Sequence, residues 1–314
     1  MSDALVEQWT AEQLHQASLA VFSDSNLSFT VRSTPATLHT RGAEGVPSVY
    51  RFANCTVEGL KTVGGLDISF RNSSGDEGVA VLVVLSFPEL KVLHTVSRRI
   101  DLSSTPYVHS FLSFREADHY AALVDDSRAI PGATMPQVLF VDGNGRWHPR
   151  QAGSAVAVGL KTGIPTVGVA KEYHPLQPSS PSLPSSHSPD PSGPFPPDFR
   201  SNQKGMRKAC QHLLQQRDDW LGLPAPQSST KEPAASQPGP DFDRNEYWGA
   251  AVLTSPSRTA SNPVYVSPGH QLSITTCIDL VLSCCTESKV PEPIRKADSI
   301  GRAEVRKIWG TCEG

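Results

Sequence analysis

The apolar positions of the chain first form three short runs separated by turns. Residues 63–70 (V-G-G-L-D-I-S-F) and 79–87 are almost wholly apolar, and residues 90–100 alternate more loosely. Runs of this length predict buried strands, and the looser alternation predicts an edge strand. Because the connections at 72–78 and 88–89 are short, the three strands are predicted to pair antiparallel as a meander.

A second pattern, which begins near residue 111, is typical of parallel sheets. The apolar spacing predicts a helix over about 111–126, a central strand over 135–142, a helix over 153–163 and a strand over 165–170. Parallel strands are usually joined by such crossover helices. We therefore predict an α/β fold with a mixed central sheet, in which three antiparallel strands are followed by parallel strands, and with helices on both faces.

The rest of the chain carries weaker patterns. Residues 3–22 have approximately helical spacing, whereas residues 23–58 are turn-rich and predict no element. Towards the C-terminus, the pattern predicts strands over 248–254 and 263–266, a turn at 267–270, and helices over 272–285 and 294–309.

Proline and serine dominate the middle of the chain. Nine of the 27 prolines lie between Pro175 and Pro197, interspersed with serines. Such a composition buries too little apolar surface to form a packed core. Residues 202–220 have the spacing of a helix, but another Pro/Ser-rich stretch follows them. We interpret about 173–243 as a flexible insertion in a single domain that spans residues 1–314.

Composition restricts the partners and the compartment. The net charge of −3 gives no basic field, so a nucleic-acid site must be a local basic patch beside metal-holding carboxylates. The six cysteines form no C-x-x-C pair, so reduced thiols are expected rather than a zinc site. No apolar run reaches 18 residues and the N-terminus does not look like a signal peptide. We expect no membrane contact and no secretion, but a monomer in the cytoplasm or the nucleus, including the nucleolus.

Three carboxylates stand where acidic residues are costly. Asp67 interrupts an apolar strand, Glu116 lies in the first half of a helix, and Asp142 ends the fourth strand. A buried charge must be paired or bound to metal, and neighbouring aspartates raise each other's pKa unless a cation is present. Oxygen ligands suit Mg²⁺ or Mn²⁺, and carboxylates that hold two such ions can promote phosphodiester cleavage. These positions are the layout of the RNase H-like fold.

Lys171 adds a base to the same predicted edge of the sheet. It ends the strand that follows Asp142, and ligands of open α/β sheets bind beyond the carboxyl ends of the strands. We therefore expect Asp142 and Lys171 to face one cleft. Taken singly, each candidate residue has an ordinary interpretation: a helix cap, a turn histidine, a half-buried tyrosine, a tight turn or a strand-end charge. Their joint order and spacing favour a site.

Six segments together resemble the endonuclease V family. They are V-G-G-L-D-I-S-F, P-Y-V-H-S-F-L-S-F-R-E, P-Q-V-L-F-V-D-G-N-G-R-W-H-P-R, G-I-P-T-V-G-V-A-K, Y-V-S-P-G-H and V-P-E-P-I-R-K-A-D, and they cover most of residues 60–171 and 262–309. This family has an RNase H-like fold and cleaves nucleic acid at the second phosphodiester bond 3′ to inosine. The resemblance implies the same fold and reaction here.

The resemblance also implies roles for individual residues. Asp67 and Asp142 would hold Mg²⁺, which Mn²⁺ can replace, and Glu116 and His270 would complete the catalytic site. A wedge would fill the gap left by the displaced inosine, since chemistry beside a stacked base requires that base to leave the stack. The implied substrate-binding residues are Pro106, Tyr107 and Val108 in the wedge, Gly143, Asn144, Gly145 and Gly153 around the base, and His148 and Lys171 on the backbone or the scissile phosphate.

The substrate expected from the resemblance is inosine-containing single-stranded RNA. The stretches S-F-P-E-L-K-V-L-H and M-P-Q-V-L-F-V-D-G-N-G look like the eukaryotic branch of the family, whose members act chiefly on RNA. A DNA-repair enzyme that takes deoxyinosine is the first alternative, and a module that binds inosine without cutting is the second. A phosphotransferase of the actin-like branch would need glycine-rich phosphate loops in two halves, and the sequence has only one such half.

Overall fold

A mixed sheet of ten strands lies at the centre of the molecule, here a computed structural model that describes residues 3–33, 37–40, 49–51, 55–72, 75–176, 199–225, 247–255 and 262–310. The sheet strands are β2 (Thr37–Thr40), β3 (Val49–Arg51), β5 (Thr62–Phe70), β6 (Glu77–Ser86), β7 (Val92–Asp101), β8 (Val138–Asp142), β9 (Thr166–Ala170), β10 (Asp219–Pro224), β11 (Tyr247–Val252) and β12 (Val264–His270). Their order is β2-β3-β10-β11-β12-β9-β8-β5-β6-β7. A separate pair, β1 (Thr30–Ser33) and β4 (Cys55–Glu58), completes the described strands.

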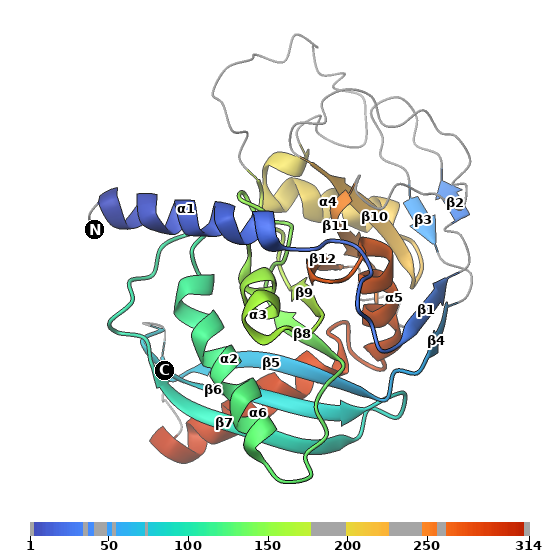
Figure 1. Cartoon of the computed structure of the whole chain (residues 1–314). Helices are drawn as coiled ribbons and strands as arrows, with labels where there is room; N and C mark the ends of the chain where they lie inside the picture. The colour runs from blue at the N-terminus through green and yellow to red at the C-terminus, as the bar shows by residue number, and fades with distance from the viewer. Residues whose placement is uncertain are drawn as a thin grey trace.

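The helices surround this sheet (Figure 1). They are α1 (Asp3–Leu19), α2 (Ser113–Ala129), α3 (Ser154–Thr162), α4 (Gln203–Leu213), α5 (Ile274–Cys284) and α6 (Glu292–Trp309), with a short 3₁₀ turn, η1 (Phe199–Ser201).

The predicted strand pairing is confirmed. β5, β6 and β7 form an antiparallel meander, and β7 is an edge strand of the sheet. β8 pairs parallel with β5 on one side and with β9 on the other. This order and these directions are those of an RNase H-like fold, which confirms the α/β prediction.

Helices cover both faces of the sheet, as predicted. One core cluster joins alternate residues of β5, β6, β8 and β9 to α5 and α6, and includes Val63, Phe140 and Ile278. A second cluster joins the other alternate residues, such as Leu66 and Val141, to α2 and α3. Figure 1 shows α2 in front of β5–β7 and α6 behind them. The parity of each strand residue therefore decides which helices it faces.

The close packing of α6 against β5 requires glycine. A Cβ on Gly65 would lie 2.1 Å from the Pro293 carbonyl oxygen, and a Cβ on Gly301 would lie 2.6 Å from the Ser69 Oγ. Because both positions lack a side chain, the backbones of α6 and β5 come close together. The C-terminal helix is thereby brought next to Asp67.

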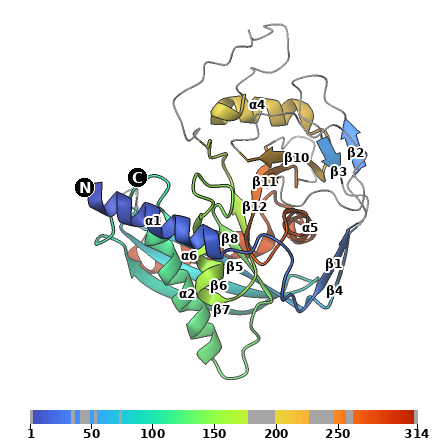
Figure 2. The same ribbon diagram turned by 45° about the horizontal axis from the view of Figure 1, so that its top comes forward.

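The predicted insertion at 173–243 is wrong for residues 199–225. β10 pairs antiparallel with β3 and β11 inside the main sheet, and α4 lies over this end of it (Figure 2). The apolar positions of α4 recur at helical spacing and pack into a third core cluster with β10 and β11. They are Met206, Ala209, Cys210 and Leu213. The flanking stretches 177–198 and 226–246 lie outside the described residues.

Two further predictions need correction. Ser267 to His270 is not a turn, because β12 continues through it to His270, with a bulge between Pro268 and His270. A bulge accommodates proline and glycine inside a strand, since it interrupts the regular ladder. Residues 23–58, which predicted no element, contribute β1, β3 and β4, as well as β2.

The described part of the chain contains no helix that is both long enough and apolar enough to cross a bilayer. Cys55, Cys210, Cys277, Cys284 and Cys285 are free thiols, and Cys312 lies outside the described residues.

Candidate active site

Asp67 and Asp142 are neighbours on adjacent parallel strands. The register of β5 and β8 pairs Leu66 with Val141, so the residue after each brings its carboxyl group to the same level. Asp67 lies on the same face of β5 as Val63, and Asp142 lies on the same face of β8 as Phe140, so both aspartates point to the face covered by α6. Asp67 is only 5% exposed. Two acidic side chains thus meet at the carboxyl end of the sheet, where the sequence predicted them.

Lys171 completes this cluster from β9. Its Nζ lies 2.6 Å from Oδ2 of Asp142, which confirms that the strand-end acid and base face one another. Burial lowers the pKa of Lys171, but the carboxylates of Asp142 and Asp67 outweigh burial, and the net pKa is raised. Lys171 is therefore a firmly charged ammonium that partly neutralises the aspartate pair.

The carboxyl group of Asp67 carries the electrostatic cost of this arrangement. Burial raises its pKa, and the nearby charge and hydrogen bond of Asp142 raise it further, while Lys171 opposes both effects. Two carboxylates this close cannot both ionise without cost, so the pair retains a proton over a wide pH range unless a cation replaces it.

Glu116 reaches towards the same end of the sheet from α2. It is 5% exposed, and its Oε2 accepts a hydrogen bond from Ser154 Oγ at 3.1 Å. Burial raises the pKa of Glu116 to about 8, although the Ser154 hydrogen bond lowers it, and the charge of Asp142 adds to the rise. Its electrostatic coupling to Asp142 places Glu116 beside the aspartate pair, as the sequence predicted.

Asp298 is a fourth acidic residue at this site, and the sequence prediction missed it. It lies on α6, and its charge raises the pKa of both Asp67 and Lys171. Ser69 Oγ lies 3.4 Å from both Oδ2 of Asp67 and the Asp298 backbone oxygen. The segment V-P-E-P-I-R-K-A-D was part of the family resemblance, and its final aspartate was the available signal.

His270 does not belong to this cluster, contrary to the sequence prediction. β12 runs antiparallel to β9, so Tyr265 pairs with Ala170 near the carboxylates, whereas His270 pairs with Thr166 at the opposite end. The Nδ1 of His270 accepts a hydrogen bond from the Val21 backbone N–H at 3.2 Å. His270 therefore anchors the chain just after α1, and the direction of β12 keeps it away from the aspartates.

The donor set suits a hard divalent cation. The acidic side chains offer only oxygen ligands, and a bound cation would relieve the burial and the mutual repulsion that raise the pKa of Asp67. Within the described ranges no three His, Cys, Asp or Glu side chains are close enough to hold a metal as they stand. In this arrangement Lys171 occupies Oδ2 of Asp142, an oxygen that a cation would take. The residues fit Mg²⁺ or Mn²⁺ by their chemistry.

Tyr107 lies on an exposed loop between β7 and α2. Its side chain is 63% exposed, and the guanidinium of Arg115 lies 5.9 Å from its ring centre. Arg115 is itself buried and donates from Nη2 to the Gly75 carbonyl. An aromatic side chain in this position is free to enter a base stack, and Pro106 restricts the backbone that presents it.

The Ser110 carbonyl fixes the far end of this loop. It accepts hydrogen bonds from Gln13 Nε2 at 3.1 Å, from His148 at 2.9 Å and from Arg150 Nη2 at 2.9 Å. Gln13 is fully buried, and its other contacts reach Ser113 and the Ala152 carbonyl. One carbonyl thereby links α1, the Tyr107 loop and the loop that follows β8.

His148 is a structural residue in this network. Its Nε2 donates to the Ser110 carbonyl and its Nδ1 accepts from the Arg150 backbone N–H. Burial lowers the pKa of His148 to about 3, and the charge of Arg150 lowers it further. Both ring nitrogens are occupied in the neutral form, so the predicted phosphate contact would require His148 to give up one of these hydrogen bonds.

Glycines shape the turn that follows Asp142. Gly143 has φ of +145°, a value that side chains disfavour. A Cβ on Gly145 would lie 2.2 Å from the Pro268 carbonyl oxygen, and one on Gly153 would lie 2.2 Å from the Asn144 carbonyl oxygen. The last two glycines therefore allow close packing of backbone segments beside Asn144, whose Oδ1 is buried with no hydrogen-bond partner among the described residues.

A family model settles what this assembly is. The model for Endonuclease V matches residues 48–190 and 222–299, which together are more than half of the chain. This chain belongs to the endonuclease V family. It is a nuclease of that type, and the family typically uses divalent metal ions.

Individual relatives agree with the family assignment. Human Endonuclease V is 34% identical over 252 residues, which cover 80% of this chain and 74% of the human protein. Endonuclease V from Roseiflexus sp. (strain RS-1) is 34% identical over 243 residues, which cover 77% of this chain and 81% of the bacterial protein.

The solved structures of endonuclease V proteins have the same fold. The catalytic domain of human Endonuclease V superposes with a TM-score of 0.70 at 29% identity, covering 99% of each chain. Endonuclease V of Ciona intestinalis, in a complex with DNA that contains an inosine followed by a ribo-adenosine, superposes with a TM-score of 0.66 at 25% identity. That match covers 98% of this chain and 100% of the other.

Proposed function

We propose that this endonuclease V hydrolyses the second phosphodiester bond 3′ to inosine, that it requires Mg²⁺ or Mn²⁺, and that it prefers single-stranded inosine-containing RNA. The Asp67–Asp142 pair carries the proposal. It brings two carboxyl groups together at the strand ends of an RNase H-like sheet, where the pKa of Asp67 is raised. Such a pair has little use in the fold unless a cation binds there.

Asp67 and Asp142 would hold the metal, with Glu116 and Asp298 approaching from the helices on the two faces of the sheet. A bound divalent ion supplies an activated water and stabilises charge on the phosphate. Lys171 would place its ammonium beside the scissile phosphate, where negative charge develops during hydrolysis. The protein's own part is to align these groups at the end of the sheet.

Recognition of inosine would use the loops around Tyr107 and Asn144. Tyr107 is exposed and would fill the space of the displaced base, a displacement that costs a few kcal/mol. Hypoxanthine presents an N1–H that adenine lacks. The Oδ1 of Asn144 is buried and has no hydrogen-bond partner in the described part of the chain, and an N1–H of this kind would satisfy it.

The preference for RNA is supported by the segments that look like the eukaryotic branch of the family. The substrate of the Ciona intestinalis structure agrees with it, since one ribonucleotide follows the inosine there. Discrimination would then depend on a 2′-hydroxyl near the cut, and small polar groups around Ser110 and Asn144 are suited to contact it.

A comparison of three substrates tests this proposal. One sequence with a single inosine is made as all-RNA, as all-DNA, and as DNA with one ribonucleotide just 3′ of the inosine. Single-turnover cleavage with Mg²⁺ is expected to be fast on all-RNA, slow on all-DNA, and largely restored by the single ribonucleotide. Equal rates on all-RNA and all-DNA would support a deoxyinosine repair enzyme instead. Tight inosine binding without cleavage of any substrate would leave a binding module.

A further inference from the structure

A small basic cavity opens beside Lys171, on the side away from β5 and β8, the strands that carry Asp67 and Asp142. Its volume is about 160 Å³, and its charged lining consists of Lys171, Arg207, Lys289 and Glu172. Arg207 comes from α4, and Lys289 comes from the connection between α5 and α6. Three cations from three separate parts of the chain thus face one space that holds a single acid.

The two outer cations of this cavity, Arg207 and Lys289, form no close ion pair with any described residue. Across the described ranges, neither Arg207 nor Lys289 lies within ion-pair distance of a carboxylate. Burial lowers the pKa of Lys289, the charges of Arg207 and Lys171 lower it further, and the charge of Glu172 opposes them only in part. The three cations therefore share one positive field, which an anion in the cavity would relieve.

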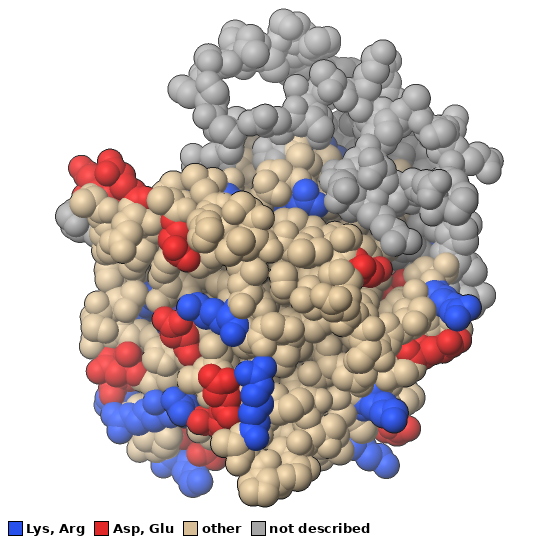
Figure 3. Space-filling view, in the orientation of Figure 1, with Lys and Arg blue, Asp and Glu red and all other residues tan. Residues whose placement is uncertain are grey.

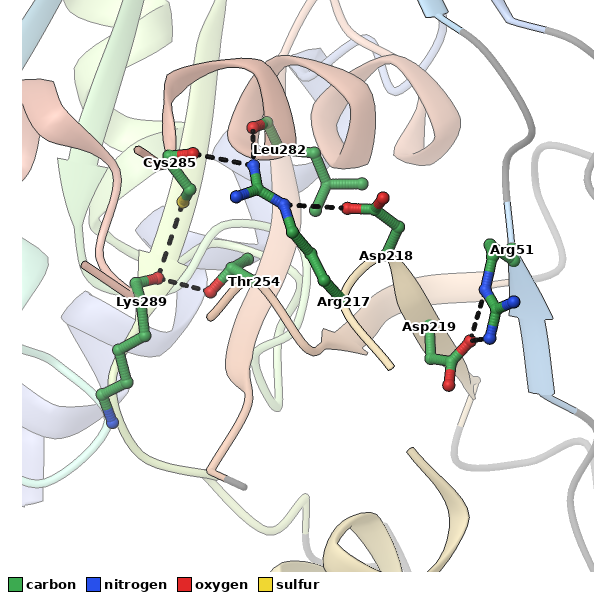
Figure 4. A network of polar contacts seen from close by, with 8 residues as sticks. All are labelled: Arg51, Arg217, Asp218, Asp219, Thr254, Leu282, Cys285 and Lys289. Carbon is green, nitrogen blue, oxygen red and sulfur yellow. Dashed lines mark hydrogen bonds and ion pairs between the residues drawn. The ribbon is translucent and has the colours of Figure 1, made fainter. Parts of the chain in front are cut away.

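Lys289 is held at its backbone, while its ammonium has no hydrogen bond or ion pair with the residues that the structure describes. The Lys289 carbonyl oxygen accepts from Thr254 Oγ1 at 2.6 Å and from Cys285 Sγ at 3.6 Å. Arg217 donates to the Leu282 and Cys285 carbonyls at the end of α5, which fixes the start of the same connection. Figure 4 shows the Lys289 Nζ pointing away from this network. The side chain is thus presented from a fixed base.

We propose that this cavity binds a backbone phosphate of the nucleic-acid substrate, at a nucleotide outside the one that is cut, and that α4 contributes Arg207 to it. The inference rests on the proposed function. Because Lys171 contacts Asp142 and also lines the cavity, a strand whose scissile phosphate lies at the carboxylates would continue past Arg207 and Lys289. Guanidinium and ammonium groups are the usual partners of phosphate oxygens.

α4 lies outside the residues that the family model matches. The family model matches residues 48–190 and 222–299, so α4 lies between the two matched segments. The helix is fixed to the sheet by its apolar face, while Arg207 lies on its exposed side. α4 would thereby extend the substrate path.

Binding in the absence of metal isolates this subsite from catalysis. The full-length chain, in EDTA, is titrated with a fluorescent single-stranded oligonucleotide that carries one inosine. The double variant Arg207→Gln/Lys289→Gln is expected to bind about tenfold more weakly at low salt. Its log Kd should also depend less on log salt, by about one unit, as expected for one to two lost phosphate contacts.

Lys208→Gln is the matched control, since Lys208 is an exposed neighbour on α4 that does not line the cavity. It should match the wild type in affinity and in salt dependence. Thermal unfolding of all three proteins should agree, because the changed side chains are at least partly exposed. Wild-type affinity and salt slope in the double variant would overturn the inference.

A scan with single methylphosphonates locates the phosphate. The wild type should lose affinity when one particular linkage outside the cut nucleotide is neutralised, and the double variant should not respond to that linkage. The opposite outcome has two parts: millimolar inorganic phosphate binds the wild type but not the double variant, and both proteins bind the oligonucleotide equally. The cavity is then a site for a free anion and the inference fails. Lack of inosine-directed cleavage by the wild type would refute the proposed function separately.

Discussion

Asp67 and Glu116 are both almost fully buried, and burial disfavours the charged form of each carboxyl group. The folded chain therefore holds protons that the unfolded chain has already released. Rising pH favours the state that has released its protons, which here is the unfolded chain. The metal-free protein should therefore lose stability as the pH rises. For Glu116 this window runs from its ordinary value of 4.5 to about 8.

The first prediction is that Glu116→Gln flattens this pH dependence. Within the window, one such group lowers the free energy of unfolding by at most about 1.4 kcal/mol per pH unit. In EDTA, the melting temperature should fall less steeply between pH 4.5 and 8.5 for the variant than for the wild type. Added Mg²⁺ should offset the loss most at high pH, where it no longer competes with protons. An unchanged slope in Glu116→Gln would contradict the assigned cause.

The second prediction concerns the aspartate pair. Asp67→Asn and Asp142→Asn should each abolish cleavage with Mg²⁺, because losing a metal ligand costs several kcal/mol of transition-state stabilisation. Both variants should still bind the substrate, and tightly, since less negative charge then faces the phosphate. Single-turnover rates and binding titrations measure the two effects. More than about a tenth of wild-type activity in either variant would refute the metal assignment.

Some residue roles could be predicted from the sequence and others could not. Asp67 and Asp142 stand out because an acid in an apolar strand is costly wherever the strand is buried. His148 could not be assigned, since its ring partner, the Ser110 carbonyl, is 38 positions away in the sequence and only packing brings them together. A histidine in a loop looks the same whether it binds substrate or holds two loops in place.

At the scale of elements, strand direction and helix packing decide which residues reach the site. β12 runs antiparallel to β9, which takes His270 away from the carboxylates. α6 lies close on β5 through Gly65 and Gly301, which brings Asp298 to them. Apolar periodicity predicts that these elements exist but not how they are oriented against each other. The sequence alone therefore indicated the wrong fourth residue.

The third prediction compares these two residues directly. Asp298→Asn should reduce single-turnover cleavage at least tenfold, because it removes a carboxylate from the metal-holding end of the sheet. His270→Gln should keep cleavage within a few-fold of the wild type and instead lower the melting temperature, since it disturbs the hydrogen bond to Val21. The reverse pattern, with cleavage lost in His270→Gln and kept in Asp298→Asn, would restore His270 to the active site.

The predicted elements are accurate where a run is long and bounded by turns. β5, β6 and the central strand β8 were all predicted close to their positions, whereas the predicted β12 ended at Val266, before the bulge at Pro268. The bulge that keeps Pro268 in the strand forms only against β9, so local sequence preferences cannot show it. α4 was discounted for a similar reason, because the composition of its neighbours outweighed its own regular apolar spacing.

At the scale of the whole molecule, the small net charge limits how nucleic acid can be attracted. On the face that Figure 3 shows, acidic and basic residues are interspersed over a largely uncharged surface. With a net charge of −3, the chain has no long-range attraction for polyanions. Binding of nucleic acid must then depend on local cations such as Lys171, Arg207 and Lys289, which makes a short flexible strand a better ligand than a long duplex.

The last prediction separates the Pro/Ser-rich stretch from α4. Replacing residues 178–196 with a short Gly/Ser linker should change stability and cleavage little, because that composition buries little apolar surface and loop length costs entropy only slowly. Removing residues 203–213 as well should destabilise the fold by several kcal/mol, since it uncovers the cluster around Leu221 and Leu223. Thermal unfolding and binding of an apolar dye measure both changes. A loss of more than about 2 kcal/mol from the linker replacement alone would show that the Pro/Ser-rich stretch packs against the sheet.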